Sequence, residues 1–300
     1  MTPAGIYVGT DDGLYVLGAD KRQELPGRRL RVLAGHGNAI WAIVGEAEIF
    51  TAGSAPIWRH VTRLRDVRAT ALYPTPDGVL IGTTDAQVYR LVDGLPRQLE
   101  SFQSVAGRET WHTPWGDPAS VRSISADDDM TYVNVHVGGI VRTTDHGVSW
   151  EPTIDIEADV HQVLALPGDR PVLAATARGL ATSWDHGTSW SDRTLGLTGT
   201  YSRALAVCGD TVLLSASYGP DGRDAAVYRG EVEGVRLERC RRGLPASLSD
   251  NVDTHCLSGD GATAAFGTSD GSVFVSQDAG RTWEQIAEGL PPVRCVFVRE

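Results

Sequence analysis

The chain has 300 residues, of which 41% are hydrophobic and 22% are charged, so it can bury a sizeable core and is neither disordered nor collagen-like. Lysine occurs only at position 21 and methionine twice, against 34 glycines and 15 prolines, a composition that disfavours a helical bundle and favours short strands joined by tight turns. The net charge of −11 argues against nucleic acid and anionic membranes as partners.

The N-terminus predicts a strand and no targeting signal. Residues 1–9 carry no basic cluster and no apolar stretch of signal-peptide length, and no part of the chain offers the roughly 20 apolar residues that a bilayer-spanning helix needs. We therefore expect a cytoplasmic location. Cys208, Cys240, Cys256 and Cys295 form no C-x-x-C pair and lie in apolar or strand-like runs, which favours reduced core thiols over disulfides or a zinc knuckle.

A short phrase recurs along the chain: a glycine or polar residue, two apolar residues of which the second is often aromatic, then polar residues and a turn. Its copies are residues 13–15, 56–58, 87–89, 139–141, 179–181, 226–228 and 272–274. The average spacing is about 43 residues, which is typical of one four-stranded propeller blade. The repeat predicts an all-β fold, a seven-bladed β-propeller of four-stranded antiparallel blades that occupies residues 1–300 as a single domain.

Turn residues between the repeats give the blade boundaries. The predicted blades are 5–30 with 291–300, then 36–66, 67–102, 117–155, 158–198, 200–245 and 250–290. In the fifth, strands are expected at 160–166, 171–176, 179–183 and after Gly187. The last residues, 293–298, have the pattern of a first strand while the N-terminus begins at a second strand, so we expect the C-terminal strand to complete blade 1 and leave no open edge.

Three turns share a sharper motif, [ST]-x-D-x-G-x-[ST]-W, at residues 143–150, 183–190 and 276–283. The motif resembles the Asp-box, or BNR repeat, of sialidases, sortilin-type receptors and photosystem II assembly factors. The whole chain resembles bacterial WD40/YVTN/BNR-like repeat proteins, a sialidase-superfamily-like propeller. The residues expected to form these turns are Asp145, Gly147, Trp150, Asp185, Gly187, Trp190, Asp278, Gly280 and Trp283. The resemblance implies a structural role for them, on the face opposite a ligand site, with His146 and His186 exposed to solvent.

Alignment of the predicted first strands brings basic residues to one position. These residues are Arg68, Arg122, His161, Arg203 and Arg294. A group of guanidinium forks suits a carboxylate, sulfate or phosphate, so the expected partner is an anionic small molecule or an acidic peptide at the top of the central channel. The alternative is that these arginines only pair with carboxylates of neighbouring blades, for which Asp12, Asp85 and Asp270 are available.

Two insertions interrupt the repeat near the same predicted face. Residues 106–117 contain Trp111, His112 and Trp115, and residues 217–224 contain Tyr218 and Arg223. The paired tryptophans could stack on a planar ligand, or they could plug the channel or cover blade edges. The second insertion would bring further polar side chains towards the pocket.

Histidines near strand ends raise the alternative of a divalent metal site. The candidates are His36, His136, His161 and His255, with Asp253 or Cys256 as a further ligand, although no H-x-H or H-E-x-x-H spacing is present and no cofactor is predicted.

The favoured function is a binding or scaffold role. The alternatives are a sialidase-like glycoside hydrolase acting on an acidic sugar and a metal-assisted lyase or hydrolase, so the residues leave catalysis open. The sialidase Arg-Ile-Pro signature and a convincing Tyr/Glu pair are both missing from this sequence.

Overall fold

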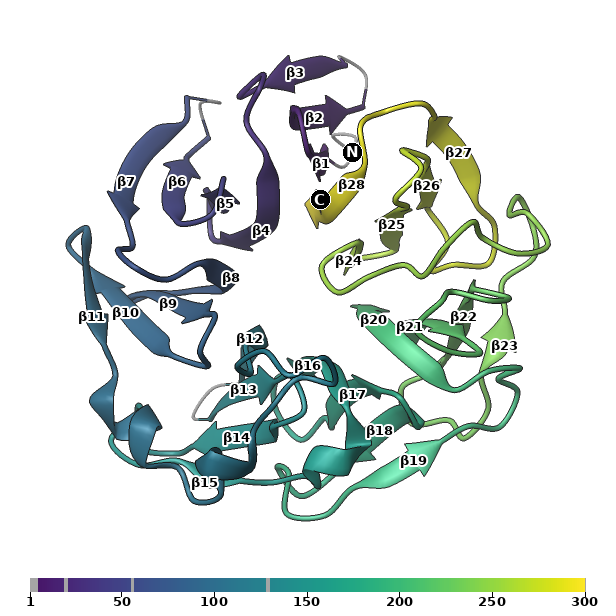
Figure 1. The fold of residues 1–300 in the computed structure, drawn as a ribbon. Coiled ribbons are helices and arrows are strands. Elements are labelled where there is room, and N and C mark those ends of the chain that lie inside the picture. The colour runs from purple at the N-terminus through teal and green to yellow at the C-terminus, as the bar shows by residue number, and fades with distance from the viewer. Residues whose placement is uncertain (1–4, 19–20, 55–56, 128–129, 300) are drawn as a thin grey trace. The chain divides into compact units, whose positions relative to one another are not determined.

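The fold is a seven-bladed β-propeller, as predicted. A computed structural model describes residues 5–18, 21–54, 57–127 and 130–299, and these residues form seven four-stranded antiparallel sheets, the blades (Figure 1). Three short 3-10 helices, η1 (Glu100–Ser104), η2 (Arg108–Thr110) and η3 (Ile156–Ala158), lie in connections between blades. Among the described residues, no helix is long and apolar enough to span a membrane.

Each blade is a meander of consecutive strands except the first. Blade 1 contains β28 (Val293–Arg299), β1 (Gly5–Thr10), β2 (Gly13–Leu17) and β3 (Arg22–Glu24). Blade 2 contains β4 (Leu30–His36), β5 (Ala39–Val44), β6 (Glu48–Ala52) and β7 (Arg59–Arg63). Blade 3 contains β8 (Ala69–Thr75), β9 (Gly78–Thr83), β10 (Val88–Val92) and β11 (Leu95–Gln98). Blade 4 contains β12 (Val121–Ala126), β13 (Thr131–Val135), β14 (Gly139–Thr143) and β15 (Glu151–Pro152). Blade 5 contains β16 (Val160–Ala165), β17 (Val172–Thr176), β18 (Gly179–Ser183) and β19 (Ser191–Arg193). Blade 6 contains β20 (Tyr201–Cys208), β21 (Thr211–Ser217), β22 (Ala226–Glu231) and β23 (Glu238–Arg239). Blade 7 contains β24 (Leu257–Asp260), β25 (Thr263–Gly267), β26 (Val273–Ser276) and β27 (Glu284–Ala287).

The C-terminal strand completes blade 1. Strand β28 pairs antiparallel with β1, with Ile6 opposite Val298 and Val8 opposite Val296, and Figure 1 shows the two strands side by side. All four of these side chains are buried. The pairing confirms the predicted closure and gives both strands a hydrogen-bonded partner in place of an exposed edge.

The chain divides into two compact units. Unit 1 comprises residues 1–33, 177–180 and 193–300, and unit 2 comprises residues 34–176 and 181–192. Each has its own core. In unit 1, Phe266 stacks on Phe274 and meets Trp283 edge-on, both at 5.0 Å between ring centroids. In unit 2, Phe102 lies within a separate apolar cluster.

Buried polar side chains join neighbouring blades within unit 2. Ser123 and Ser125 of β12 accept hydrogen bonds from the N–H groups of Val163 and Ala165 of β16, both at 2.9 Å. The fully buried Asn134 donates from its side-chain amide to the carbonyl at the start of β16 at 2.9 Å. These bonds satisfy backbone groups that lie between sheets and would otherwise be costly to bury.

Blade 2 departs from the prediction in two ways. The phrase at residues 56–58 is not a third strand: that strand is β6, while Ile57 and Trp58 lie between β6 and β7, and Pro56 lies outside the described residues. Ile57 is 70% exposed, whereas Ile49 of β6 is fully buried. The blade also starts at Leu30 rather than residue 36, because the Gly37–Asn38 turn connects two strands of the same blade. The other predicted ranges each enclose the four strands of one blade.

The three Asp turns connect the third and fourth strands of blades 4, 5 and 7. In the first, the Thr143 hydroxyl donates to Asp145 Oδ1 at 2.7 Å and accepts from the N–H of Gly147 at 2.9 Å. Asp145 also accepts from the backbone N–H of Ser149 at 2.9 Å and from its hydroxyl at 2.5 Å. Gly147 has φ +90°, a conformation that other residues resist. Asp145 and Gly147 thus hold this turn through the carboxylate and the left-handed glycine backbone.

The same contacts recur at the other two Asp turns. Hydrogen bonds from Ser189 lower the pKa of Asp185 to about 2. Desolvation opposes the shift at Asp278, yet hydrogen bonds from Thr282 still lower its pKa to about 2. The turns are therefore built around ionised carboxylates.

The residue before the turn glycine has a left-handed backbone in all three turns, and its carbonyl accepts a bond from an arginine of the preceding blade. The donor and acceptor pairs are Arg90 to His146, Arg142 to His186 and Arg229 to Ala279. Both histidines are exposed, as expected. Through these bonds, each arginine links an Asp turn to the preceding blade, a role that the motif did not indicate.

Candidate functional site

The predicted basic residues all lie where the first strand of a blade begins. Arg122, His161 and Arg294 are the second residues of β12, β16 and β28, Arg203 is the third of β20, and Arg68 directly precedes β8. The alignment of repeats is correct for Arg122 and His161 and for Arg294, which lie at the same register shift of their strands. It is wrong for Arg68, because the equivalent residue of β8 is Thr70, two positions later. What each side chain contacts differs from blade to blade.

In unit 2, Arg68 lines a pocket of about 690 Å3 at blades 2 and 3. The walls are the β5–β6 loop with Glu46, the end of β7 with Arg63, the β7–β8 connection with Arg65, and the β9–β10 loop with Thr84. Residues 117–118 also line the pocket. Three arginines and four carboxylates face this pocket, so it presents both charge signs to a ligand.

The backbone of Arg68 is fixed, while its side chain is only loosely held. Its N–H donates to Thr84 Oγ1 at 3.2 Å, and its carbonyl accepts from the Thr84 N–H at 2.9 Å. The guanidinium lies 3.9 Å from Glu46, and the two side chains are 64% and 47% exposed. Exposed pairs at such a distance contribute little free energy, so a ligand carboxylate can compete for Arg68.

In unit 1, Arg294 is engaged by its own chain. Its Nε and Nη2 donate to the two carboxylate oxygens of Asp11 at 2.9 and 2.6 Å, and Arg29 Nε lies 2.8 Å from the same carboxylate. The hydrogen bond from Arg294 holds the pKa of Asp11 below its usual range. Arg294 is therefore paired with a carboxylate, as the pairing alternative expects, but the partner is Asp11 of the same blade rather than Asp12 or a carboxylate of a neighbouring blade.

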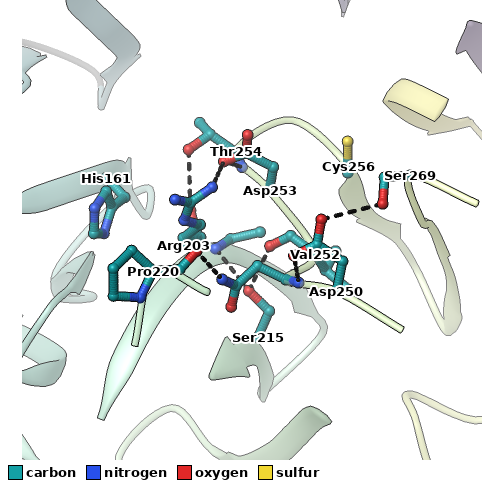
Figure 2. A network of polar contacts seen from close by, with 12 residues as sticks. His161, Arg203, Ser215, Pro220, Asp250, Val252, Asp253, Thr254, Cys256 and Ser269 are labelled. Atoms are coloured by element: carbon teal, nitrogen blue, oxygen red, sulfur yellow. Dashed lines mark hydrogen bonds and ion pairs between the residues drawn. The ribbon is translucent and has the colours of Figure 1, made fainter. Parts of the chain in front are cut away.

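Arg203 is held in a second network of unit 1 (Figure 2). Its Nη1 lies 3.4 Å from Asp253 Oδ1, and its guanidinium lies 5.4 Å from the ring centre of Tyr201. Burial is the largest single effect and lowers the pKa of Arg203, but Asp253, Tyr201 and Asp250 together outweigh it, so the pKa is raised. Thr254 donates to the Arg203 carbonyl at 3.1 Å and fixes the strand start. Asp253, a suggested metal ligand, is thus an arginine partner.

The two tryptophans of the first insertion have different surroundings. Trp111 packs on Phe102 at 5.8 Å, and the Arg108 guanidinium lies 4.9 Å from its ring, so Trp111 covers the core. Trp115 is 66% exposed, and its ring lies 5.2 Å from that of His136. His112 is exposed, with Nδ1 2.9 Å from the carbonyl of Thr110. Of the two tryptophans, Trp115 is the one whose ring is mostly exposed.

The second insertion lies between β21 and β22, as expected. The Arg223 guanidinium lies 5.1 Å from the ring centre of Tyr218, whose side chain is exposed. The Tyr218 N–H donates to the Arg223 carbonyl at 2.9 Å, and Asn251 donates to the carbonyl of Gly219 at 3.2 Å. The two predicted residues therefore stabilise this loop of unit 1 by contacting each other.

Two of the four candidate histidines come together in unit 2. His136, in the loop before β14, and His161, in β16, both approach the carboxylate of Asp159. His136 and Asp145 lie at opposite ends of β14. Asp159 was not among the predicted ligands, although its position two residues before His161 was a signal that the sequence offered.

The other two candidate histidines lie elsewhere. His36 ends β4 and lines a second pocket of unit 2, of about 410 Å3, and His255 occupies a turn of unit 1 with φ +69°. Cys256, suggested as a further ligand, is a buried free thiol, and burial raises its pKa well above the usual value. The other three cysteines are also buried and free, as predicted.

Comparisons with solved structures support the fold. The chain is similar to the computationally designed protein Ika8 (13% identity, TM-score 0.61, 96% of this chain and 85% of that one). It is also similar to a chain of the nidogen/laminin complex (9%, 0.60, 99% and 98%) and to YCF48 bound to D1 peptide (16%, 0.59, 85% and 80%). No protein-family model and no curated protein matches the sequence.

Proposed function

We propose that this chain is a binding or scaffold propeller that holds an acidic peptide, or a similar anionic ligand, in the pocket of blades 2 and 3. The observation that carries the proposal is Arg68, fixed through its backbone and loosely paired at its side chain, in a pocket of about 690 Å3. Volumes of roughly 300 to 1,000 Å3 are usual for ligand sites.

The mixed charge of the pocket favours a peptide over a simple anion. Arg63, Arg65 and Arg68 can donate to a ligand carboxylate, while Glu46 and Asp85 can accept from backbone N–H groups of the same ligand. YCF48, one of the similar structures, is bound to a peptide, which makes this ligand class the first to test.

The unit 1 arginines weigh against the sialidase-like alternative. The resemblance to that family implies arginines that receive a substrate carboxylate, yet Arg294 already holds Asp11 and Arg203 lies against Asp253. A substrate would have to displace these partners. The three Asp turns still support our proposal that the chain is an Asp-box protein. Its cytoplasmic location stays a prediction from the sequence.

The test is binding of a fluorescein-labelled hexapeptide of Asp and Glu with a free C-terminus, measured by fluorescence anisotropy. We expect saturable binding that weakens with salt, and a loss of about 10- to 100-fold in Arg68→Ala, the value of a charge-assisted pair. Arg97→Ala, in the exposed part of β11, is the matched control and should bind like the unchanged protein. Absence of binding, or equal affinity in Arg68→Ala, refutes the proposal.

A further inference from the structure

A carboxylate and two imidazoles converge in unit 2. His136 Nε2 lies 3.5 Å from Asp159 Oδ1, and His161 Nε2 lies 3.5 Å from Asp159 Oδ2. One donor atom from each residue lies within 4.8 Å of those of the other two. The three residues come from a loop of blade 4, the connection to blade 5 and the first strand of blade 5.

The separations match those expected around a shared metal ion. An N–H···O hydrogen bond is usually 2.7–3.2 Å long, so 3.5 Å is long for a direct bond between imidazole and carboxylate. Two ligand atoms that each lie about 2.0–2.2 Å from a tetrahedral metal are about 3.3–3.5 Å apart. Each imidazole is thus spaced from the carboxylate as two ligands of one ion would be, and the three ligand atoms lie within 4.8 Å of one another.

The three side chains are held in a sheltered place. The side chains of His161, His136 and Asp159 are 0%, 5% and 23% exposed. The His136 N–H donates to the Ser120 carbonyl at 2.9 Å, and the Asp159 N–H donates to the Ile156 carbonyl at 3.1 Å. Asp159 has a left-handed backbone with φ +48° at the end of η3. Ligands fixed by the backbone in this way lose little freedom on binding an ion.

We propose that His136, Asp159 and His161 bind a divalent transition metal ion. Two imidazole nitrogens and one carboxylate oxygen suit Zn2+ or Fe2+ and are a poor set for Mg2+ or Ca2+, which prefer oxygen ligands. Three protein ligands leave a coordination position for water or a small ligand, as in catalytic metal sites rather than closed structural ones. The exposed ring of Trp115 lies 5.2 Å from the ring of His136, next to these ligands.

The first experiment is a Co2+ titration of tag-free protein that has been treated with chelator and desalted. We expect one ion per chain, the visible absorption of low-coordinate Co2+, and displacement by Zn2+. Asp159→Asn and His161→Gln should each weaken binding by at least about tenfold, the loss found even when a residue outside the ligand set is changed. His112→Gln and His255→Gln are matched controls outside the cluster and should bind normally.

The second measurement needs no variant, because His161 is buried and its substitution could unfold the chain. Cu2+ bound to the unchanged protein should show magnetic coupling to two imidazole nitrogens in its electron paramagnetic resonance spectrum. Less than one ion per chain, coupling to fewer than two nitrogens, or equal affinity in a folded Asp159→Asn variant would show that Asp159 and the histidines form only a structural contact.

Discussion

The backbone of Gly243 lies so close to the backbone of Trp283 that no residue with a side chain fits at position 243. Its φ is +79°, and an added Cβ would lie 1.7 Å from the carbonyl oxygen and 2.7 Å from the carbonyl carbon of Trp283. Trp283 is buried, its N–H donates to the Arg242 carbonyl at 2.9 Å, and its ring meets Phe266 at 5.0 Å. A methyl group at position 243 must therefore displace the Trp283 backbone.

The free-energy cost of Gly243→Ala follows from these contacts. A left-handed backbone costs a non-glycine residue about 1–2 kcal/mol. Loss of the Trp283 to Arg242 hydrogen bond adds about 1 kcal/mol, and disturbed packing of the indole adds at least about 1 kcal/mol more. The expected total is about 3–5 kcal/mol. Gly289→Ala is the matched control, because Gly289 has φ +66° but no atom within 4 Å of an added Cβ, and should cost only about 1–2 kcal/mol.

The assay is urea denaturation of the unchanged protein and both variants, followed by tryptophan fluorescence and far-ultraviolet circular dichroism. We expect a lower denaturation midpoint for Gly243→Ala than for Gly289→Ala, with the slopes unchanged. Equal midpoints would refute the reasoning, because the two variants share the left-handed backbone and differ only in the contact with Trp283.

Two further predictions concern titratable groups. The folded-state pKa values of Asp185 and Asp278 are about 2, below the ordinary 3.8, so their contribution to stability is present above about pH 4 and is lost as the pH falls towards about 2. Urea midpoints should drop across that range, and less steeply in Asp278→Asn; an equal slope would contradict the prediction. Cys256 and Cys295 are buried and their pKa values are raised by burial, so a chromogenic thiol reagent should modify them only after denaturation, and rapid reaction of the native protein would contradict this.

The blade architecture was predictable because its signals are local. Each Asp turn is closed by hydrogen bonds between residues at most four positions apart, such as Ser149 to Asp145, so the motif alone specifies the turn. Blade 2 shows the limit of this reasoning. The apolar pair Ile57 and Trp58 imitates the repeated phrase, but only packing reveals that Ile49, not Ile57, is buried.

The candidate site depended on contacts that no local pattern contains. Repeat alignment placed Arg68 and Arg294 at the same strand position, but it could not say that one would face a pocket and the other a carboxylate. Likewise, the sequence did not distinguish His136 from the other histidines, because only the packing of blade 5 against blade 4 places Asp159 beside it.

The sequence by itself determined the blade count, the Asp turns and the equivalent positions of Arg122, His161 and Arg294, because a repeated unit carries the same local interactions each time. The tertiary structure alone decided the partners of those residues. Arg294 meets Asp11 across 283 positions of the chain only because β28 pairs with β1. A charged side chain is stabilised by whichever group lies beside it after folding, and that neighbour is set by the packing of strands rather than by distance along the chain.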